Sequence, residues 1–495
     1  MTAGGPTATR PEKAAPHRID VFAHSRNTGL LLVMLAVASN VYMGNVLGYA
    51  ARFSSRESDG QLVIPGTHAS YLYTAHLLTL LSFGAECVWR KWRNRGRRAL
   101  DRTRHPLASE RIEQLVSEMG LKRRPRLATA PWLGDQAFAG GLARFPLWRP
   151  YLAIGPGLLA LGDRQDRTAY QVFSAIISHE LAHLRNRDVF LLNIITGLRL
   201  NNAVITVFFI CVLPLDSGIT ATGLFYGITA LAVFALVVEV VCRELLRARE
   251  SYADQRAAQH RPEELSLALR RATQAPTRSG RDRAAFLRTW WDWHPSPRTR
   301  LRHLLKPGDL LRFPALYLVI GGLLAGVSWV TTAAALSNAV GADPAENITL
   351  FVTAALVGAP LGAFAAAGLW RQERHSDGRL LRSMAVLLKN TVVLAVAVHL
   401  GSHLTPLGPY GKPHFELVFP ATPVLPWSPP LHVLCCLALV GWPHVVAMLR
   451  RLARPAPRRT GALSRCLLVM VATLVGFSLF VLLPWVAGYG KVVLP

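Results

Sequence analysis

The sequence predicts a mainly α-helical protein that crosses a membrane about nine times and carries one smaller α+β domain outside the bilayer. Of its 495 residues, 51% are hydrophobic and only 17% are charged, whereas a soluble globular protein carries roughly 25% charged residues. The mean hydropathy is +0.28. The apolar residues lie in long runs that basic loops separate. This pattern is typical of a polytopic membrane protein and excludes a disordered or collagen-like chain.

The formal net charge of +26 is compatible with nucleic-acid binding. The position of the basic residues along the sequence distinguishes this interpretation from membrane association. The basic clusters at 90–98 and 450–459 adjoin apolar runs, as the cytoplasmic loops of membrane proteins do. The expected partner is therefore a lipid bilayer and not a nucleic acid.

Eight apolar runs have the length of about 20 residues that a bilayer core requires. They cover residues 28–49, 69–89, 220–241, 315–336, 348–369, 383–403, 431–449 and 467–485. A ninth run at 201–215 is shorter and less apolar. Residues 1–27 begin with a stretch rich in Ala, Pro, Thr and Gly and are expected to form a disordered tail.

The basic connections set the orientation of these spans. Lysine and arginine gather at 90–98, 371–382 and 450–465, whereas 339–347 and 405–430 contain only Lys412. Basic loops stay in the cytoplasm, so the N-terminus is predicted inside and the C-terminus outside. Arginine is abundant and lysine scarce, which is typical of a GC-rich bacterial genome. The predicted location is thus a bacterial plasma membrane, crossed several times.

This topology divides the chain into membrane and cytosolic parts. The polar segments 90–200 and 243–312 both face the cytoplasm and are expected to form one domain, because together they are long enough for one small core. Two spans within 28–89 precede this domain, and a transmembrane hairpin at 201–242 interrupts it. Residues 313–495 hold five further spans whose composition does not indicate a role.

The strongest chemical signal is the motif HExxH at residues 179–183. Residues 167–177 before it contain no Pro or Gly and predict a helix. On a helix, His179 and His183 lie one turn apart on one face, so both imidazoles can reach one metal ion. Glu180 lies beside them and can act as the general base toward a water that the metal activates. The alternative is a helix with two surface histidines.

A zinc site needs a third protein ligand. Glu250 and Asp254 are four residues apart on a predicted helix after the hairpin, so Glu250 can ligate while Asp254 fixes the tautomer of a ligating histidine, namely His179. Only an even number of crossings returns Glu250 to the membrane face of His179, which supports the weak span at 201–215. The alternative is an exposed acidic pair on an arginine-rich helix.

Several motifs, in this order along the chain, resemble peptidase family M48, the HtpX-like and CAAX-protease-like membrane zinc peptidases. The resemblance covers about residues 111–305 and includes HELAH with Asp188 downstream, RESYAD at 249–254, and three further stretches. These are AFAGG at 137–141, YLAIG at 151–155, and HPSP at 294–297 followed by Arg300. Gln136 departs from the family, which commonly has Asn there.

The resemblance implies a cytosolic zincin-like α+β metallopeptidase domain with one Zn²⁺ per chain. It implies hydrolysis of peptide bonds in protein or peptide substrates associated with the membrane. Asp188 is then expected to support a histidine ligand, and Ala137, Phe138 and Ile154 to contact the substrate. The strand at 151–155 is expected to pair with an extended substrate peptide, as edge strands do.

His294 has two interpretations. A histidine in the matching His-Pro context of CAAX-protease-like relatives is thought to donate a hydrogen bond to the oxyanion of the tetrahedral intermediate, which a positioned imidazole can do. Alternatively, His294 caps a helix that begins near Pro295.

Two further alternatives concern the whole site. Intramembrane peptidases of the site-2 type also use HExxH, with a ligating Asp in a Leu-Asp-Gly context that Leu215 and Asp216 resemble. The predicted topology places Asp216 on the opposite side of the membrane from His179. A non-enzymatic membrane sensor or transporter-like protein with a catalytically silent domain is the rival function.

Glu239, inside a predicted span, is expected to face the peptidase interior or to pair with an arginine.

Overall fold

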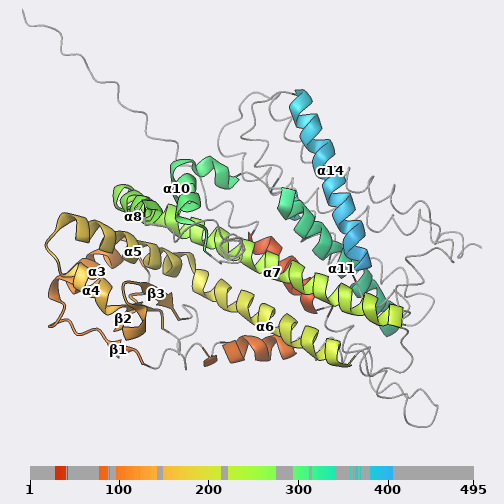
Figure 1. The fold of residues 1–495 in the computed structure, drawn as a ribbon, viewed down its shortest axis with the longest axis horizontal. Helices are drawn as coiled ribbons and strands as arrows, with labels where there is room; N and C mark the ends of the chain where they lie inside the picture. The colour runs from red at the N-terminus through yellow and green to blue at the C-terminus, as the bar shows by residue number, and fades with distance from the viewer. Residues whose placement is uncertain are drawn as a thin grey trace, which may run out of the picture.

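The computed structural model describes residues 28–40, 42, 77–86, 88–89, 96–121, 123–141, 149–212, 221–274, 294–311, 315–340 and 380–404, with a few residues between 357 and 368. The described residues are mainly helical and include one small sheet, as predicted. A compact group of strands and short helices lies at one end, and long helices extend from it (Figure 1).

The sheet has four strands: β1 (Arg98–Ala99), β2 (Arg126–Thr129), β3 (Ala137–Gly140) and β4 (Tyr151–Ile154). Their order is β1-β2-β4-β3. β4 pairs in parallel with β2 and antiparallel with β3, so β4 is an interior strand and β3 lies at the edge. The prediction that the strand at 151–155 pairs with substrate is therefore wrong, because both edges of β4 are already hydrogen-bonded within the sheet.

Three helices complete the compact end: α3 (Pro106–Glu118), α4 (Pro156–Gly162) and α5 (Arg167–Asn186). α3, α4, α5 and β4 share one apolar core that includes Ile112, Leu152, Leu158 and Phe173. A 3-10 turn, η1 (Pro131–Leu133), leads toward β3.

The helix that carries the HExxH motif, α5, begins where the sequence predicts. Asp166 is its N-cap, and its carboxylate accepts hydrogen bonds from the backbone N–H groups of Thr168 at 3.2 Å and Ala169 at 2.9 Å, which satisfies two donors of the first turn. Arg187 ends the helix in the left-handed region with φ 63°. This sharp joint separates α5 from the next helix, which starts at Asp188.

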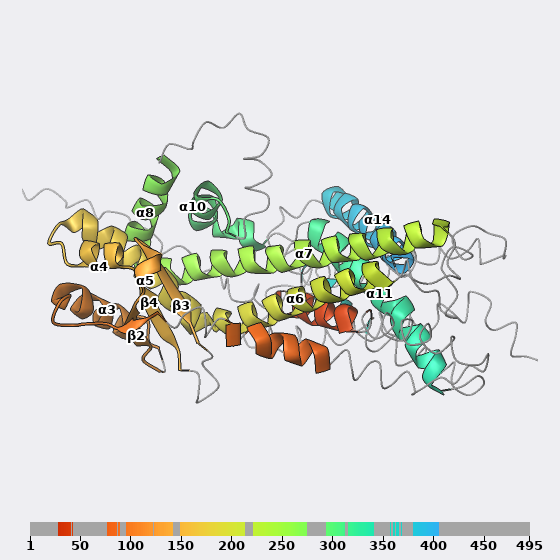
Figure 2. The ribbon, with the colours of Figure 1, turned by 60° about the horizontal axis from the view of Figure 1, so that its bottom comes forward.

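Two long helices follow, α6 (Asp188–Val212) and α7 (Ala221–Ala258). They lie side by side in both views (Figure 2) and contact each other. α8 (Pro262–Gln274) packs against α5, α10 (Pro297–Leu305) packs against α8 and α7, and the 3-10 helix η3 (Pro307–Leu311) follows α10. α11 (Ala315–Val340) packs closely against α14 (Leu380–His403). A second apolar core joins these long helices and includes Leu35, Leu231, Phe234, Leu324 and Leu394.

The described part of the chain contains one helix with the length and hydropathy of a membrane span, Asp188–Phe208 within α6, against nine predicted runs. Shorter apolar helices cover Thr28–Asn40, Leu77–Glu86, Ala315–Ser328 and Leu388–Gly401. The spans predicted at 431–449 and 467–485, most of the span at 348–369, and the tail at 1–27 lie outside the described residues.

Two predicted boundaries fall inside continuous helices. The hairpin was expected to begin at residue 201, but α6 is continuous from Asp188. α7 is likewise continuous from Ala221 to Ala258, so no break separates the second arm of the hairpin from the polar segment that carries Glu250. The reason for the first difference is that Asn193 and Arg199 lower the hydropathy of the first turns of α6 without ending the helix.

Candidate metal centre

The two histidines of the HExxH motif face the same point from successive turns of α5. Their Nε2 atoms are 3.2 Å apart, and their rings meet edge to face with centroids 4.7 Å apart. Both side chains are largely buried, with exposed fractions of 10% for His179 and 13% for His183. The helical spacing therefore places two nitrogen donors together, away from bulk water.

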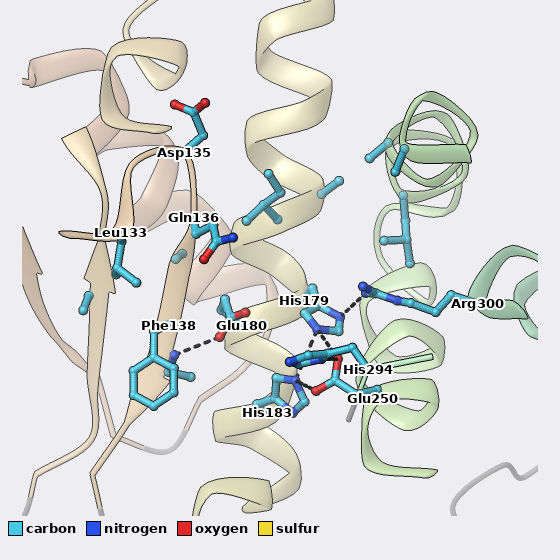
Figure 3. Close-up of a pocket in the computed structure, with 18 of the residues that line it drawn as sticks. Leu133, Asp135, Gln136, Phe138, His179, Glu180, His183, Glu250, His294 and Arg300 are labelled. Carbon is cyan, nitrogen blue, oxygen red and sulfur yellow. Dashed lines mark hydrogen bonds and ion pairs between the residues drawn. The ribbon is translucent and has the colours of Figure 1, made fainter. Parts of the chain in front are cut away.

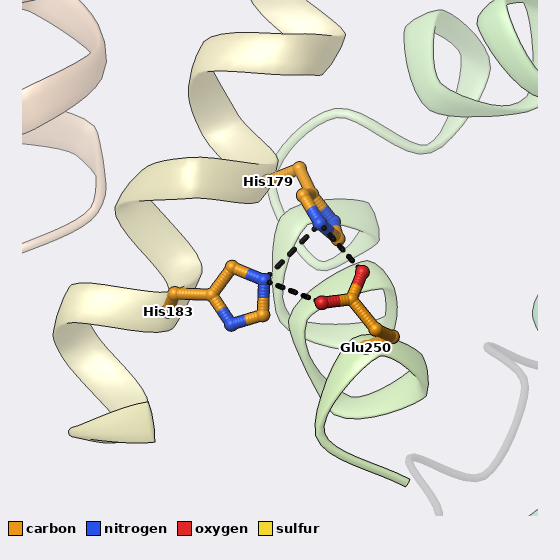
Figure 4. A group of neighbouring side chains, drawn as sticks. All are labelled: His179, His183 and Glu250. Carbon is orange, nitrogen blue, oxygen red and sulfur yellow. Dashed lines mark hydrogen bonds and ion pairs between the residues drawn. The ribbon is translucent and has the colours of Figure 1, made fainter. Parts of the chain in front are cut away.

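The third side chain comes from α7. Glu250 lies with Oε2 at 3.3 Å from His179 Nε2 and Oε1 at 3.4 Å from His183 Nε2. One donor atom from each of the three residues fits within 4.8 Å (Figure 4). Two imidazole nitrogens and one carboxylate oxygen form a donor set that zinc accepts. The residues present therefore fit a zinc ion, with one coordination position left for water or substrate.

Carboxylates hold the far side of each imidazole. Asp254 Oδ1 is 2.9 Å from His179 Nδ1, and Asp188 Oδ2 is 3.0 Å from His183 Nδ1. An ionised carboxylate can only accept, so each Nδ1 carries the proton and donates. The Nε2 lone pairs are thereby left free for a metal. The structure places Asp254 against His179, the partner that the sequence predicts, and Asp188 against the other histidine.

Two arginines neutralise these carboxylates. Arg300, from α10, donates to Asp254 through Nη2 at 2.6 Å and Nε at 2.8 Å. Arg249 Nη1 lies 3.3 Å from Asp188 Oδ1. Sequence reasoning assigned no role to either arginine. A signal was available, because a buried carboxylate needs a cationic or hydrogen-bonding partner, but spacing alone does not identify which of the many arginines supplies it.

The electrostatics of the centre favour positive charge. Burial lowers the pKa of His183, but the charge of Glu250 and hydrogen bonds to Asp188 and Glu250 outweigh burial and hold that pKa well above its ordinary value. Burial raises the pKa of the Glu250 carboxyl, yet the charge of His183 and hydrogen bonds from His179, His183 and His294 hold it well below its ordinary range. The negative charge of Glu250 that raises the pKa of His183 also attracts a metal cation, and the lowered pKa of Glu250 keeps that carboxylate ionised.

Glu180 is directed toward the sheet. Its Oε2 accepts a hydrogen bond of 2.8 Å from the backbone N–H of Ala139 in β3 (Figure 3). In an antiparallel pair the backbone groups of successive residues alternate between the partner and the outside. Those of Ala137 and Ala139 therefore face away from β4, and the edge strand fixes the carboxylate that the sequence predicts as general base.

His294 lies at the rim of the centre. Its Nδ1 is 3.1 Å from Glu250 Oε2, and its side chain is 73% exposed. The hydrogen bond to Glu250 raises the pKa of His294 above its ordinary value, against the opposing effect of burial. The capping interpretation is wrong, because α10 begins at Pro297 and Ser296 is its N-cap, accepting from the backbone N–H of Thr299.

A cavity of about 1270 Å³ contains the centre. Ala137, Phe138 and Gln136 line it beside His179 and Glu180 (Figure 3). The expected substrate contact of Ile154 is wrong, since its side chain is fully buried and packs in the core beneath the sheet. An interior strand presents alternate side chains to the core, and Ile154 is one of those.

Glu239 pairs with arginines, one of its two predicted roles. It accepts hydrogen bonds from Arg243, at 2.7 Å to Nη2, and from Arg199 of α6. Asp216, the ligand of the site-2 alternative, lies outside the described residues.

One helix supplies two histidines and the Glu180 carboxylate, which a sheet edge fixes, and a second helix supplies a glutamate. This is the arrangement of a metal-dependent hydrolase. Residues 108–307 match the family model for peptidase family M48. This match confirms the resemblance to that family seen in the sequence. No curated protein and no solved structure matches the chain.

Proposed function

We propose that the chain is an integral membrane zinc endopeptidase that cleaves protein substrates at the cytosolic face of a bacterial plasma membrane. The observation that carries the proposal is the convergence of His179, His183 and Glu250, with Nδ1 of both histidines bound to a carboxylate. The family match supports peptidase chemistry.

The catalytic roles follow from position. When bound, zinc supplies a Lewis acid that polarises the scissile carbonyl and acidifies water. Glu180 accepts a proton from the attacking water and later delivers it to the leaving amine. The N–H of Ala139 holds the Glu180 carboxylate in place. His294, beside Glu250 at the rim, donates a hydrogen bond to the oxyanion.

Substrate binding is assigned to β3. Its outward backbone groups, apart from the Ala139 N–H that binds Glu180, can pair with an extended peptide, which is a common mode of peptide recognition. An antiparallel arrangement is favoured, because it is slightly more stable per residue than a parallel one. Ala137 and Phe138 then lie beside the substrate backbone at the cavity wall.

The membrane location rests on the distribution of charge and on α6. Asp188 both supports His183 and begins the helix that is long and apolar enough to span a membrane, so the metal centre lies next to the first turn of that helix. A cysteine introduced at Gly280 is expected to resist an impermeant reagent in intact cells and to react after lysis. Reaction in intact cells would show that the peptidase domain is not cytosolic.

The activity test compares purified full chain with Glu180→Gln. Zinc measured by atomic spectroscopy is expected at one ion per chain in both proteins, while only the unchanged protein cleaves a casein-type substrate and a chelator stops it. Zinc without hydrolysis in the unchanged protein would favour the catalytically silent sensor instead.

A further inference from the structure

The cavity continues beyond the metal centre in both directions along α5. One end, here called the α8 end, is lined by Val172 of α5 and by Leu265 and Leu269 of α8, with the charged residues Arg164 and Arg271 exposed there. It therefore opens among charged groups. Asp166 also lines this end.

The opposite end, here called the α6 end, is also lined by apolar residues, but its charged residues are buried or half-buried. Leu192 and Ile195 of α6, Leu246 of α7 and Trp89 line it. Leu192 and Ile195 belong to Asp188–Phe208, the helix with the properties of a membrane span. Glu86 also lines this end, and its two other charged residues, Asp188 and Arg249, are paired with each other.

The direction of β3 relates the two ends to a bound peptide. Along β3, the chain passes from Asp135 and Gln136 toward Phe138 in the same direction as α5 passes from His179 to His183 (Figure 3). The C-terminal end of β3 therefore points toward the α6 end. A peptide that pairs antiparallel with β3 has its N-terminal part at the α6 end and its C-terminal part at the α8 end.

Resting on the proposed peptidase function, we propose that the substrate carries an apolar segment immediately N-terminal to the scissile bond, and that the α6 end of the cavity receives this segment. The lining fits three or four residues. Asp188 and Ile195 are separated by roughly 10 Å along α6 at 1.5 Å per residue. Three extended residues cover a similar length at about 3.3 Å each.

The location of the α6 end explains why apolar substrate residues are preferred there. Its walls are the first turns of a membrane-capable helix, and apolar side chains bind there because burial removes them from water. A polypeptide cleaved next to its own hydrophobic segment, on the C-terminal side of that segment, meets both requirements. Arg164 and Arg271 at the α8 end suit the polar chain that follows.

The test uses three synthetic peptides with the same central sequence and the zinc-loaded full chain. One peptide has three leucines before the cleavable core, one has them after it, and one has polar residues on both sides. Cleavage sites are identified by mass spectrometry. The peptide with N-terminal leucines is expected to show kcat/KM roughly 10 to 100-fold above the polar peptide, as apolar pockets discriminate, and the C-terminal version is expected to resemble the polar peptide.

Substitutions in the cavity wall test whether the preference for N-terminal leucines arises at the α6 end. Leu192→Gln, or Leu246→Gln on the facing helix if the first variant is unstable, is expected to remove most of the advantage of N-terminal leucines. Leu200→Gln is the matched control, because Leu200 is 41% exposed on the same helix and is not among the lining residues. It should leave the ratio of the two kcat/KM values unchanged.

The outcomes are distinguishable. Equal cleavage of all three peptides, or a preference for the C-terminal leucines, overturns the inference and leaves the peptidase proposal standing. An unaltered advantage in Leu192→Gln and Leu246→Gln also overturns it. If the zinc-loaded chain cleaves none of the peptides nor casein, the proposed function fails and the inference fails with it.

Discussion

The metal centre has two arms, each made of one histidine ligand and the carboxylate that binds its Nδ1. The arms look alike in sequence but are anchored differently. In one arm, His179 bonds Asp254, which accepts two short hydrogen bonds from Arg300, at 2.6 and 2.8 Å. Arg300 Nη2 also lies 3.2 Å from His179 Nδ1. Here each charged group has a close partner, and Asp254 is 3% exposed.

In the other arm, His183 bonds Asp188, which has longer contacts to Arg249 at 3.3 Å and to Asn186 at 3.4 Å. Arg249 Nη2 lies 3.2 Å from Thr28 Oγ1, in the apolar helix Thr28–Asn40. The arm of His179 is thus fixed by α7 and α10, whereas the arm of His183 reaches the helices of the apolar core. Charge-assisted bidentate bonds are the stronger kind, so the first arm should tolerate less change.

The largest effect is expected from removing a ligand, where the arms should be equal. His179→Ala, His183→Ala and Glu250→Ala should each lose zinc and all hydrolysis, because a three-ligand site does not survive with two. Zinc content after dialysis is the measurement, and Glu180→Gln is the control that keeps zinc. Stoichiometric zinc with activity in Glu250→Ala would show that the third ligand is another residue.

His294 belongs to neither arm, so its loss should separate chemistry from metal binding. His294→Ala is expected to lower kcat by roughly 10² to 10³-fold with little change in KM, as the loss of an oxyanion donor does. Zinc content and melting temperature should be unchanged. A kcat equal to that of the unchanged protein, measured per zinc-loaded molecule, would remove His294 from catalysis.

Replacing Asp254 or Asp188, the carboxylates that support the histidines, should show that the two arms are anchored unequally. Asp254→Asn and Asp188→Asn should each weaken zinc binding by roughly 10 to 100-fold, as the loss of such supporting groups does. Asp254→Asn is expected at the upper end, because it leaves Arg300 without its partner. Competition with a chelating dye gives the two dissociation constants. A larger loss in Asp188→Asn would reverse the ranking of the arms.

The smallest effects are expected at the arginines. Arg300→Lys cannot keep two parallel bonds to Asp254 and should weaken zinc binding by up to ~10-fold. Arg249→Lys replaces a single long contact and should change it less. The same dye competition measures both, and Arg302→Lys, on α10 outside the cavity lining, is the matched control. Equal losses in the two test variants would mean that bond geometry at the carboxylates is unimportant.

Features determined by local spacing could be predicted from the sequence. The absence of Pro and Gly at 167–177 predicted a helix there, and α5 starts at Arg167. The four-residue spacings on α5 and α7 predicted which side chains share a face, and the structure brings His179, His183 and Glu250 together. The need for a third ligand restricted the choice to carboxylates at helical spacing.

Features that depend on distant partners could not be predicted in this way. The edge position of β3 depends on strand order, and strands close in sequence carry no signal of which one lies inside the sheet. Arg199 lowered the hydropathy of the first turns of α6, but its charge is balanced by Glu239 on α7. For the same reason the pairing of Asp254 with Arg300 was not visible, since the two residues are on separate helices.

The placement of the ligands on both sides of a helical hairpin links metal binding to folding. His179 and His183 lie before α6, and Glu250 lies near the end of α7. A complete site therefore exists only after the hairpin has brought α7 against α5. A ligand that binds only the folded state stabilises it by about 2.7 kcal/mol when its free concentration is 100 times the dissociation constant. A bound zinc ion would thus act as a noncovalent cross-link between α5 and α7, and the metal content of a preparation would report how completely the hairpin has assembled.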